Sequence, residues 1–166
     1  MESKDLLVLL GNQLFPIDKI RETHPDCIFM AEDHNLCTYE KHHKLKILMF
    51  LCAMREKRDE LVQNNFSVFY SEIGSDDFLI PYEEKLKKYI IENKINHIKF
   101  FEIEDKFFEK RILNLGKKNS LKINQIRSPM FLMERHEFKD YLSKNKRPFM
   151  ANFYKIVRTK MNLLMN

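Results

Sequence analysis

Short runs of consecutive apolar residues alternate along the chain with longer segments in which apolar positions recur every three or four residues. A continuous apolar run is typical of a strand buried on both faces of a parallel sheet, and the longer periodic segments predict helices. The expected strands cover residues 6–10, 27–30, 67–72, 97–102 and 121–126. The expected helices cover residues 16–22, 39 to about 64, 81–93, 104–115, 134–143 and 149–164.

Strands and helices that alternate at this spacing are typical of βαβ units. The pattern therefore predicts a doubly wound α/β fold, with a five-stranded, mostly parallel sheet and helices on both faces. Because residues 121–126 alternate apolar and polar positions, we place that strand near a sheet edge. We expect Gly116 to end the helix before it, and a loop at residues 34–38. The α/β domain is expected to span residues 1–148.

The most distinctive segment is the expected helix that starts at Tyr39. Its first part is basic and rich in histidine, and eight consecutive apolar residues follow at 47–54. That run is too short to cross a bilayer. A helix that is apolar all round must be covered on both sides. We expect the sheet on one side, and another helix or a partner domain on the other.

Composition narrows the class of protein. The 166 residues are 44% hydrophobic and 32% charged, which argues against disorder, and the net charge of +5 permits a polyanionic partner without requiring one. Cys27, Cys37 and Cys52 lie in or beside apolar runs, which favours a reduced, cytoplasmic protein over a disulfide scaffold. Cys52 is expected to be an inert core thiol. The N-terminus lacks the features of a secretory signal, and no segment predicts membrane insertion.

Polar side chains gather where the expected strands end. In a doubly wound sheet, ligands bind beyond the carboxyl ends of the strands, near the switch point. Amides, carboxylates, an aromatic ring and cations together suit a polar heterocycle with a hydroxylated tail. The same residues also fit strand ends that are merely solvated, and the sequence favours neither interpretation. The residues expected at this rim are Gly11, Asn12, Gln13, Glu32, Glu72 and Glu102, with Tyr39, His42, His43 and Lys46 from the first turns of the helix.

Other kinds of site find little support. There is no glycine-rich fingerprint after the first strand and no Walker-type lysine, so neither a dinucleotide site nor a P-loop is predicted. Adjacent histidines on a helix point about 100° apart, and no Cys-x-x-Cys pair is present, so we expect no metal site near His42 and His43. No Ser or Cys occupies a nucleophile elbow, and we expect no catalytic residue.

Several collinear segments resemble the N-terminal domain of the deoxyribodipyrimidine photolyase-related family, which includes iron-sulfur bacterial cryptochromes and 6-4 photolyases. The resemblance implies DNA repair or light sensing, with FAD and an iron-sulfur cluster in a C-terminal helical domain. It also implies a dimethyl-ribityllumazine antenna chromophore in the N-terminal domain. The segments are Leu9-Leu10-Gly11-Asn12-Gln13-Leu14-Phe15-Pro16, His42-His43-Lys44-Leu45-Lys46, Ala53-Met54-Arg55, Met150-Ala151-Asn152-Phe153-Tyr154, Arg158 and Leu163-Leu164-Met165.

By this resemblance the lumazine would lie in the crevice at the strand ends and pass excitation energy to the flavin. The residues it assigns to chromophore binding are Gly11, Asn12, Gln13, Glu32, Tyr39, His42, Lys46 and Glu102. Residues 149–166 would form a helix that leads toward the FAD-binding domain.

The chain departs from the family pattern at three places. Asn12 stands where the family has Asp in Gly-Asp-Gln-Leu, so an amide replaces a carboxylate. The family's Glu-Pro-Gly-Glu-Trp is replaced by Glu-Ile-Glu-Asp-Lys at residues 102–106, and Asn162 takes the place of an expected Gly.

The sequence also ends at Asn166, before any FAD-binding domain or cluster cysteines. We therefore expect no photorepair from this chain alone, and a surface that docks on a flavin-binding domain or partner chain or that self-associates. DNA contact is expected only through the full assembly.

A second hypothesis is a small basic α/β interaction or nucleic-acid-binding protein without a chromophore. It predicts a steep loss of affinity with salt and no colour. The cations it would use are Lys41, Lys44, Lys46, Lys139, Lys144, Lys146, Arg147, Arg158 and Lys160.

Overall fold

Five parallel strands form the centre of the fold in the computed structural model, which describes residues 4–164. The strands are β1 (Asp5–Val8), β2 (Cys27–Ala31), β3 (Val68–Ser71), β4 (His97–Phe101) and β5 (Lys122–Ile126). The helices are α1 (Ile17–Arg21), α2 (His34–Thr38), α3 (Lys44–Gln63), α4 (Tyr82–Glu92), α5 (Lys106–Lys118), α6 (Arg135–Lys144) and α7 (Met150–Met161). The predicted doubly wound α/β fold is confirmed.

The strand order is β3-β2-β1-β4-β5, and every neighbouring pair is parallel. The chain builds the sheet outward from β1 in one direction, through β2 to β3, and then returns to place β4 on the other side of β1. The topological switch point therefore lies between β1 and β4. All five residues of β2 and of β4 are buried, whereas β5 is partly exposed along its length. The predicted edge position of β5 is confirmed.

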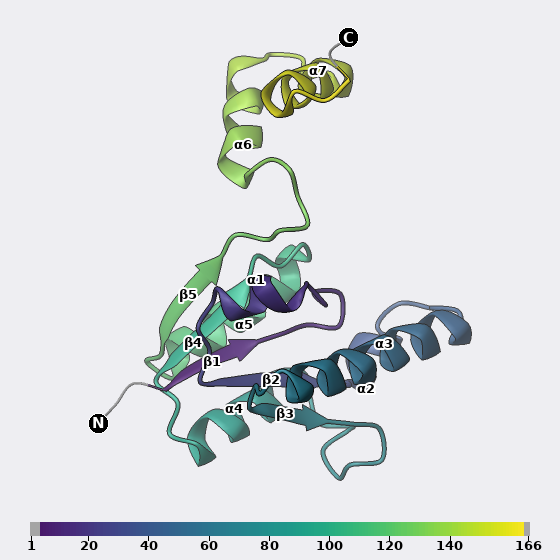
Figure 1. The fold of residues 1–166 in the computed structure, drawn as a ribbon, viewed down its shortest axis with the longest axis vertical. Coiled ribbons are helices and arrows are strands. Elements are labelled where there is room, and N and C mark those ends of the chain that lie inside the picture. Colours follow the sequence, from purple (N-terminus) through teal and green to yellow (C-terminus); the bar gives the residue numbers. More distant parts are fainter. Residues whose placement is uncertain (1–3, 165–166) are drawn as a thin grey trace. The chain divides into compact units, whose positions relative to one another are not determined.

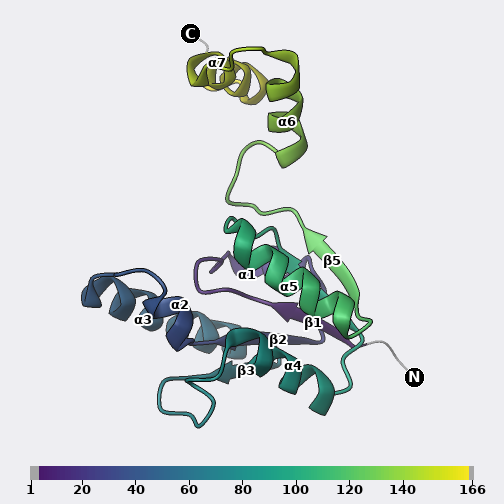
Figure 2. The ribbon, with the colours of Figure 1, turned by 180° about the vertical axis from the view of Figure 1, so that it is seen from behind.

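Helices cover the sheet of the α/β unit on both faces. One core lies under α1 and α3, which are seen in front of the sheet in Figure 1, and it includes Ile20, Leu51 and Leu61. The other core lies under α4 and α5, which are seen in Figure 2, and it includes Leu86 and Ile112. Alternate residues of each inner strand contribute to the two cores, which is why the strands read as continuous apolar runs.

Two predictions about helix ends near residue 40 are wrong. Residues 34–38 form the short helix α2 rather than a loop, because the Asp33 side chain accepts a hydrogen bond from the Leu36 N–H at 3.0 Å and caps its start. The long helix α3 begins at Lys44, not at Tyr39. His43 is its N-cap residue, and its Nδ1 accepts from the Leu45 N–H at 3.2 Å. Tyr39 and His42 therefore lie in the connection before α3.

The prediction that Gly116 ends its helix is also wrong, because α5 continues to Lys118. Gly116 is buried where α5 crosses β5. A Cβ atom at this position would lie 2.5 Å from Ile123 Cδ1 and 3.4 Å from Ile98 Cδ1. The glycine therefore permits close contact between helix and sheet instead of a helix stop.

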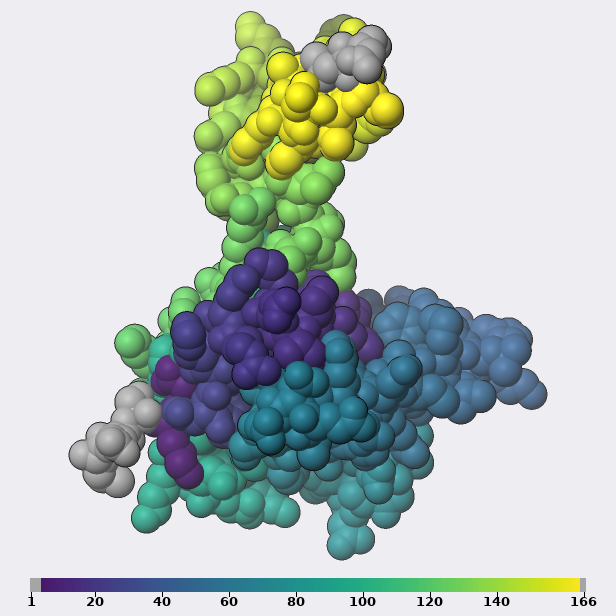
Figure 3. Space-filling model, in the orientation of Figure 1, coloured from purple at the N-terminus to yellow at the C-terminus, as the bar shows by residue number. Residues whose placement is uncertain are grey.

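The outer side of α3 is exposed, so no helix of residues 4–164 covers it, and the alternative of a partner domain on this side stays a prediction. Leu51, Met54 and Leu61 are buried against the sheet. The first turns of α3, with the connection before them, project beyond the carboxyl ends of the strands in Figure 1 and form the blue lobe on the right of Figure 3. Cys52 is exposed there, so the expectation of a core thiol is wrong. We call the following residues the α3 outer face: Leu45, Leu48 and Met49, with exposed fractions of 61%, 56% and 62%, and Cys52.

The chain divides into two compact units, one up to Ile126 and one from Arg127 onward. In the second unit, the Phe153 ring packs on Phe138 and Tyr141, and the Tyr141 hydroxyl donates to the Phe149 carbonyl at 2.7 Å. Helix α6 thus belongs with α7. The expected division at residue 149, toward a flavin-binding domain, stays a prediction.

Helix α7 ends at a left-handed residue, Asn162, with φ of 51°. Asn is the side chain that best replaces Gly in this conformation, so this departure from the family pattern preserves the turn. Within residues 4–164, no helix has the length and apolar character needed to cross a membrane.

Candidate functional site

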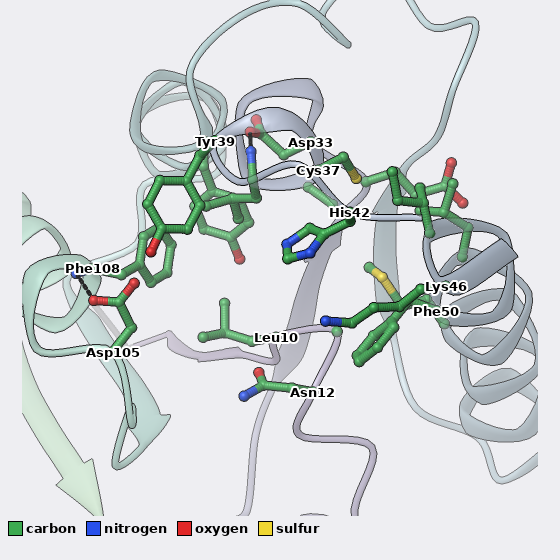
Figure 4. Close-up of a pocket in the computed structure, with 18 of the residues that line it drawn as sticks. Leu10, Asn12, Asp33, Cys37, Tyr39, His42, Lys46, Phe50, Asp105 and Phe108 are labelled. Atoms are coloured by element: carbon green, nitrogen blue, oxygen red, sulfur yellow. Dashed lines mark hydrogen bonds between the residues drawn. The ribbon is translucent and has the colours of Figure 1, made fainter. Parts of the chain in front are cut away.

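A cavity of about 290 Å³ opens at the carboxyl ends of β1, β2 and β4, at the switch point of the sheet. This volume lies close to the lower end of the range for small-molecule sites, roughly 300–1,000 Å³. Its walls come from the connections after these strands, the segment from α2 into α3, and the first turns of α4 and α5. Figure 4 shows the side chains that line it. The whole cavity belongs to the unit that ends at Ile126.

Six of the eight residues expected to bind a ligand lie around this one cavity. They are Gly11, Asn12, Glu32, Tyr39, His42 and Lys46. They come from two strand ends, from the connection before α3 and, for Lys46, from the first turn of α3. Tyr39 and His42 are not in the helix that we expected to carry them. Ligand binding by these residues stays a prediction.

The other two residues lie outside the cavity lining. The Gln13 side chain is fully buried, and its Nε2 donates to the Glu102 carbonyl oxygen at 3.0 Å. This bond ties the connection after β1 to the connection after β4, which gives Gln13 a structural role. The side chains that follow Glu102 occupy the cavity wall instead, namely Ile103, Glu104 and Asp105.

Two further residues expected at the rim also lie elsewhere. His43 is occupied as the N-cap of α3. The Glu72 carboxylate is half-exposed and lies 3.7 Å from Arg58 Nη1. Neither side chain lines the cavity.

Glu32 is a buried carboxylate whose hydrogen-bonding capacity is used by the protein. It accepts from Arg55 Nε at 2.7 Å and Nη2 at 3.0 Å, from the Tyr70 hydroxyl at 2.8 Å and from the Ile73 N–H at 2.7 Å. Burial alone would raise the pKa of Glu32, but these bonds outweigh it and hold the pKa below its ordinary value. Glu32 thus fixes the cavity wall and joins β2, β3 and α3.

The neighbouring Asp33 forms an ion pair in which both partners are buried. Its Oδ2 lies 3.1 Å from Lys85 Nζ, and both side chains are almost completely shielded from solvent. Lys85 Nζ also donates to the Glu32 carbonyl at 2.9 Å and to the Phe78 carbonyl at 3.1 Å. The ammonium therefore holds the end of β2 to the segment before α4.

Three polar atoms of the cavity lining are shielded from solvent and have no hydrogen-bond partner among the described residues, namely Asp33 Oδ2, the Tyr82 hydroxyl and Glu104 Oε1. The Lys85 ammonium lies 3.1 Å from Asp33 Oδ2 and compensates its charge, which leaves the Tyr82 hydroxyl and Glu104 Oε1 without a partner in residues 4–164. Burial and the nearby charge of Asp33 raise the pKa of Tyr82 above its ordinary value, so its hydroxyl is a neutral donor and acceptor. Native proteins rarely leave buried polar atoms unpaired. Both atoms therefore fit contacts with a ligand.

Aromatic rings and cations complete the lining. Figure 4 shows His42, Lys46 and Phe50 on one side of the cavity, and Tyr39, Asp105 and Phe108 on the other. Asp105 caps α5, because its side chain accepts from the Phe107 N–H at 2.8 Å and the Phe108 N–H at 3.1 Å. Rings on both sides and polar groups between them suit a flat heterocycle. Within residues 4–164, no three His, Cys, Asp or Glu side chains gather as metal ligands would.

Sequence reasoning missed several lining residues. Phe50 lies in an apolar run that we assigned to helix packing as a whole. Tyr82 and Phe108 come from helices whose first turns reach the cavity only through the tertiary fold. Asp33 and Asp105 carried a usable signal, because each stands directly before a helix as an N-cap residue does.

This fold and cavity define a doubly wound α/β domain with a small-molecule-sized site at its topological switch point. Residues 7–166 match the model of the deoxyribodipyrimidine photo-lyase-related protein family. The chain belongs to this family.

A relative with a known activity is the (6-4) photolyase of Agrobacterium fabrum (strain C58). It is 27% identical to the chain over 168 aligned positions, which cover 97% of this chain and 32% of that photolyase. The chain thus spans about a third of the length of this relative.

Proposed function

We propose that the chain is a chromophore-binding module of a photolyase or cryptochrome, and that its cavity holds a ribityllumazine-type antenna. The observation that carries the proposal is the cavity at the switch point, lined by six of the residues that the resemblance assigns to the chromophore. When bound, such a chromophore absorbs near-ultraviolet or blue light and passes the energy to a flavin. The free cysteines are compatible with action in the cytoplasm.

The lining residues have distinct tasks in this proposal. Phe50 and Phe108 present apolar surface to the faces of the ring system. Lys46 and His42 offer donors to ring carbonyls or ribityl oxygens on their side of the cavity. Glu32 binds no ligand atom directly and instead positions the wall through Arg55, Tyr70 and the Ile73 N–H.

Replacing Phe50 by Ala tests the proposal with little risk to folding, because the side chain is 36% exposed. We expect dimethyl-ribityllumazine to bind the wild-type chain and to bind Phe50→Ala about tenfold more weakly, since a ring contact is lost. A fluorescence titration of the lumazine measures both affinities.

Phe107→Ala is the matched control, because Phe107 is also aromatic and on a helix, but is 79% exposed and outside the cavity lining. It should bind like the wild type. A folded wild-type chain that binds no lumazine, or equal affinities of all three proteins, would contradict the proposal.

We propose in addition that the α3 outer face docks on a flavin-binding domain. It is an exposed apolar surface next to the cavity, since Lys46 and Phe50 of the same helix line the site. Energy transfer to a flavin requires such proximity. Photorepair and DNA contact then belong to the assembly that contains the flavin, and this chain contributes no catalytic residue.

Without its partner, the exposed α3 outer face should cause the chain to self-associate. The double substitution Leu48→Glu and Met49→Glu places charges on it, and we expect the weight-average mass in sedimentation equilibrium to fall to that of a monomer. Ile91→Glu is the control, because Ile91 is equally exposed, at 61%, but lies on α4. A wild-type chain that stays monomeric at high concentration would refute this expectation.

The nucleic-acid hypothesis gains nothing from the structure. Among its cations, Lys160 pairs with Glu137, and Arg158 donates to the carbonyl groups of Leu163 and Leu164 at the end of α7. The remaining cations are divided between the two compact units. We therefore rank this hypothesis second.

A further inference from the structure

Two departures from the family pattern meet in the cavity. Asn12 stands where the resemblance implies an Asp, and Glu104 lies in the segment where it implies Glu-Pro-Gly-Glu-Trp. Asn12 Nδ2 donates to Glu104 Oε2 at 3.0 Å. An ionised Asp at position 12 has no proton to donate and would set two carboxylates against each other. The two departures are therefore coupled, because the amide permits the carboxylate.

This hydrogen bond satisfies only one of the two carboxylate oxygens of Glu104. Oε1 is shielded from solvent and has no hydrogen-bond partner in the part of the chain that the structure describes. A buried carboxylate oxygen needs a donor, and a hydrogen bond to an ionised acceptor is about twice as strong as a neutral one. A donor from a ligand in the cavity would satisfy it.

Tyr82 provides a second and independent observation. The residue is only 2% exposed, lines the same cavity and leaves its hydroxyl without a partner among residues 4–164. The hydroxyl comes from α4, whereas Glu104 follows β4. The two unpaired groups therefore reach the cavity from different elements of the fold.

We propose that Glu104 and Tyr82 make this cavity selective for a ligand that presents a hydrogen-bond donor to Glu104 Oε1, with the Tyr82 hydroxyl as a second polar contact. The proposal rests on the proposed function and specifies how the chromophore is recognised. A ribityllumazine carries two kinds of donor, the ring imide N–H and the ribityl hydroxyls. A ligand that presents an anionic group to this wall is disfavoured by the Glu104 carboxylate.

Three probes test this specificity by fluorescence titration of the chain. They are dimethyl-ribityllumazine, its N-methyl imide derivative, and an ethyl analogue without ribityl hydroxyls. We expect Glu104→Gln to weaken binding of the first probe about tenfold, because a charge-assisted bond is lost. One of the two analogues lacks the donor that bonds to Glu104. That analogue should bind the wild type more weakly than the parent lumazine does, and it should bind Glu104→Gln with the same affinity as the wild type. The analogue that behaves in this way identifies the donor.

Glu102→Gln is the matched control, because this carboxylate is two residues away and outside the cavity lining. It should leave all three affinities unchanged.

Tyr82→Phe distinguishes a contact with the ligand from a purely structural role of the hydroxyl. Removing an unpaired buried hydroxyl should raise the thermal midpoint of the ligand-free chain. The same substitution should weaken binding of dimethyl-ribityllumazine about fivefold to tenfold, because a contact made only with the ligand is lost. A tyrosine that serves only packing would leave the affinity unchanged.

The outcomes separate this inference from the proposed function. If the wild type binds the parent lumazine, and neither Glu104→Gln nor Tyr82→Phe changes its affinity by more than twofold, the inference is wrong and the proposed function stands. If the folded wild type binds no lumazine, the proposed function is overturned and the inference with it. The inference is supported if Glu104→Gln and Tyr82→Phe both bind the parent lumazine more weakly than the wild type and Glu102→Gln binds it equally well.

Discussion

Replacing Lys85 by Met lowers the free energy of unfolding by about 3–5 kcal/mol, because it leaves a buried charge without a partner. The Lys85 ammonium lies 3.1 Å from Asp33 Oδ2 and donates to two main-chain carbonyls, those of Glu32 and Phe78. Methionine fills a similar volume and contributes none of these interactions. Urea denaturation measures the loss as a lower midpoint at an unchanged slope.

Lys87→Met is the matched control on the same helix. Lys87 is half-exposed and has an ion pair with Glu84 at 3.7 Å, so its loss should change stability by less than about 0.5 kcal/mol. The double variant Lys85→Met with Asp33→Asn should recover part of the loss, since the uncompensated carboxylate is gone. A cost below about 1 kcal/mol for Lys85→Met alone would contradict the assigned role of this pair.

Glu32→Ala is expected to lower the free energy of unfolding by about 3 kcal/mol or more. The substitution removes four hydrogen bonds at once and leaves the Tyr70 hydroxyl and the Ile73 N–H without their acceptor. Glu72→Ala removes an exposed carboxylate at the end of the adjacent strand and serves as the control. Equal thermal midpoints of the two variants would show that the Glu32 contacts do not stabilise the fold.

The Glu32 carboxylate should also make the stability of the folded chain sensitive to acid. The pKa of Glu32 in the folded chain is below its ordinary value of 4.5, so the unfolded chain takes up the proton first as the pH falls. Stability from this group is therefore present above about pH 4.5 and is lost as the pH falls through the folded pKa. The difference in unfolding free energy between wild type and Glu32→Ala should shrink over this range. A constant difference would contradict the assignment.

The structural role of Glu32 decides which substitutions give a clear test of ligand binding. The sequence suggested Glu32 as a ligand-binding carboxylate, but its substitution would disturb the wall of the site together with β2 and β3. Phe50, Tyr82 and Glu104 line the cavity without carrying comparable structural bonds. Loss of binding in variants of these residues is therefore easier to interpret.

The sheet was predictable because its inner strands are buried on both faces, which leaves continuous apolar runs in the sequence. The ends of the helices were less predictable from the sequence, since they depend on single side-chain contacts. His43 starts α3 by accepting the Leu45 N–H, which no periodicity reveals. Gly116 looked like a helix stop, yet its absent side chain makes room for Ile123.

The site was partly predictable for a related reason. The switch-point rule locates the strand ends that carry Asn12 and Glu32, but not the direction of each side chain there. Gln13 turns inward to bind the Glu102 carbonyl, and Glu104 takes the place on the wall that we gave to Glu102. Tyr82 reaches the cavity only through the packing of α4, which a single sequence does not encode locally.

Chromophore binding in this cavity is tested most directly by a crystal structure of the chain grown with dimethyl-ribityllumazine. We expect the ring system between Phe50 and Phe108, with a ligand donor within hydrogen-bond distance of Glu104 Oε1. Crystals grown at saturating lumazine that show the ligand at another place on the chain, or no ligand in the cavity, would contradict the central proposal.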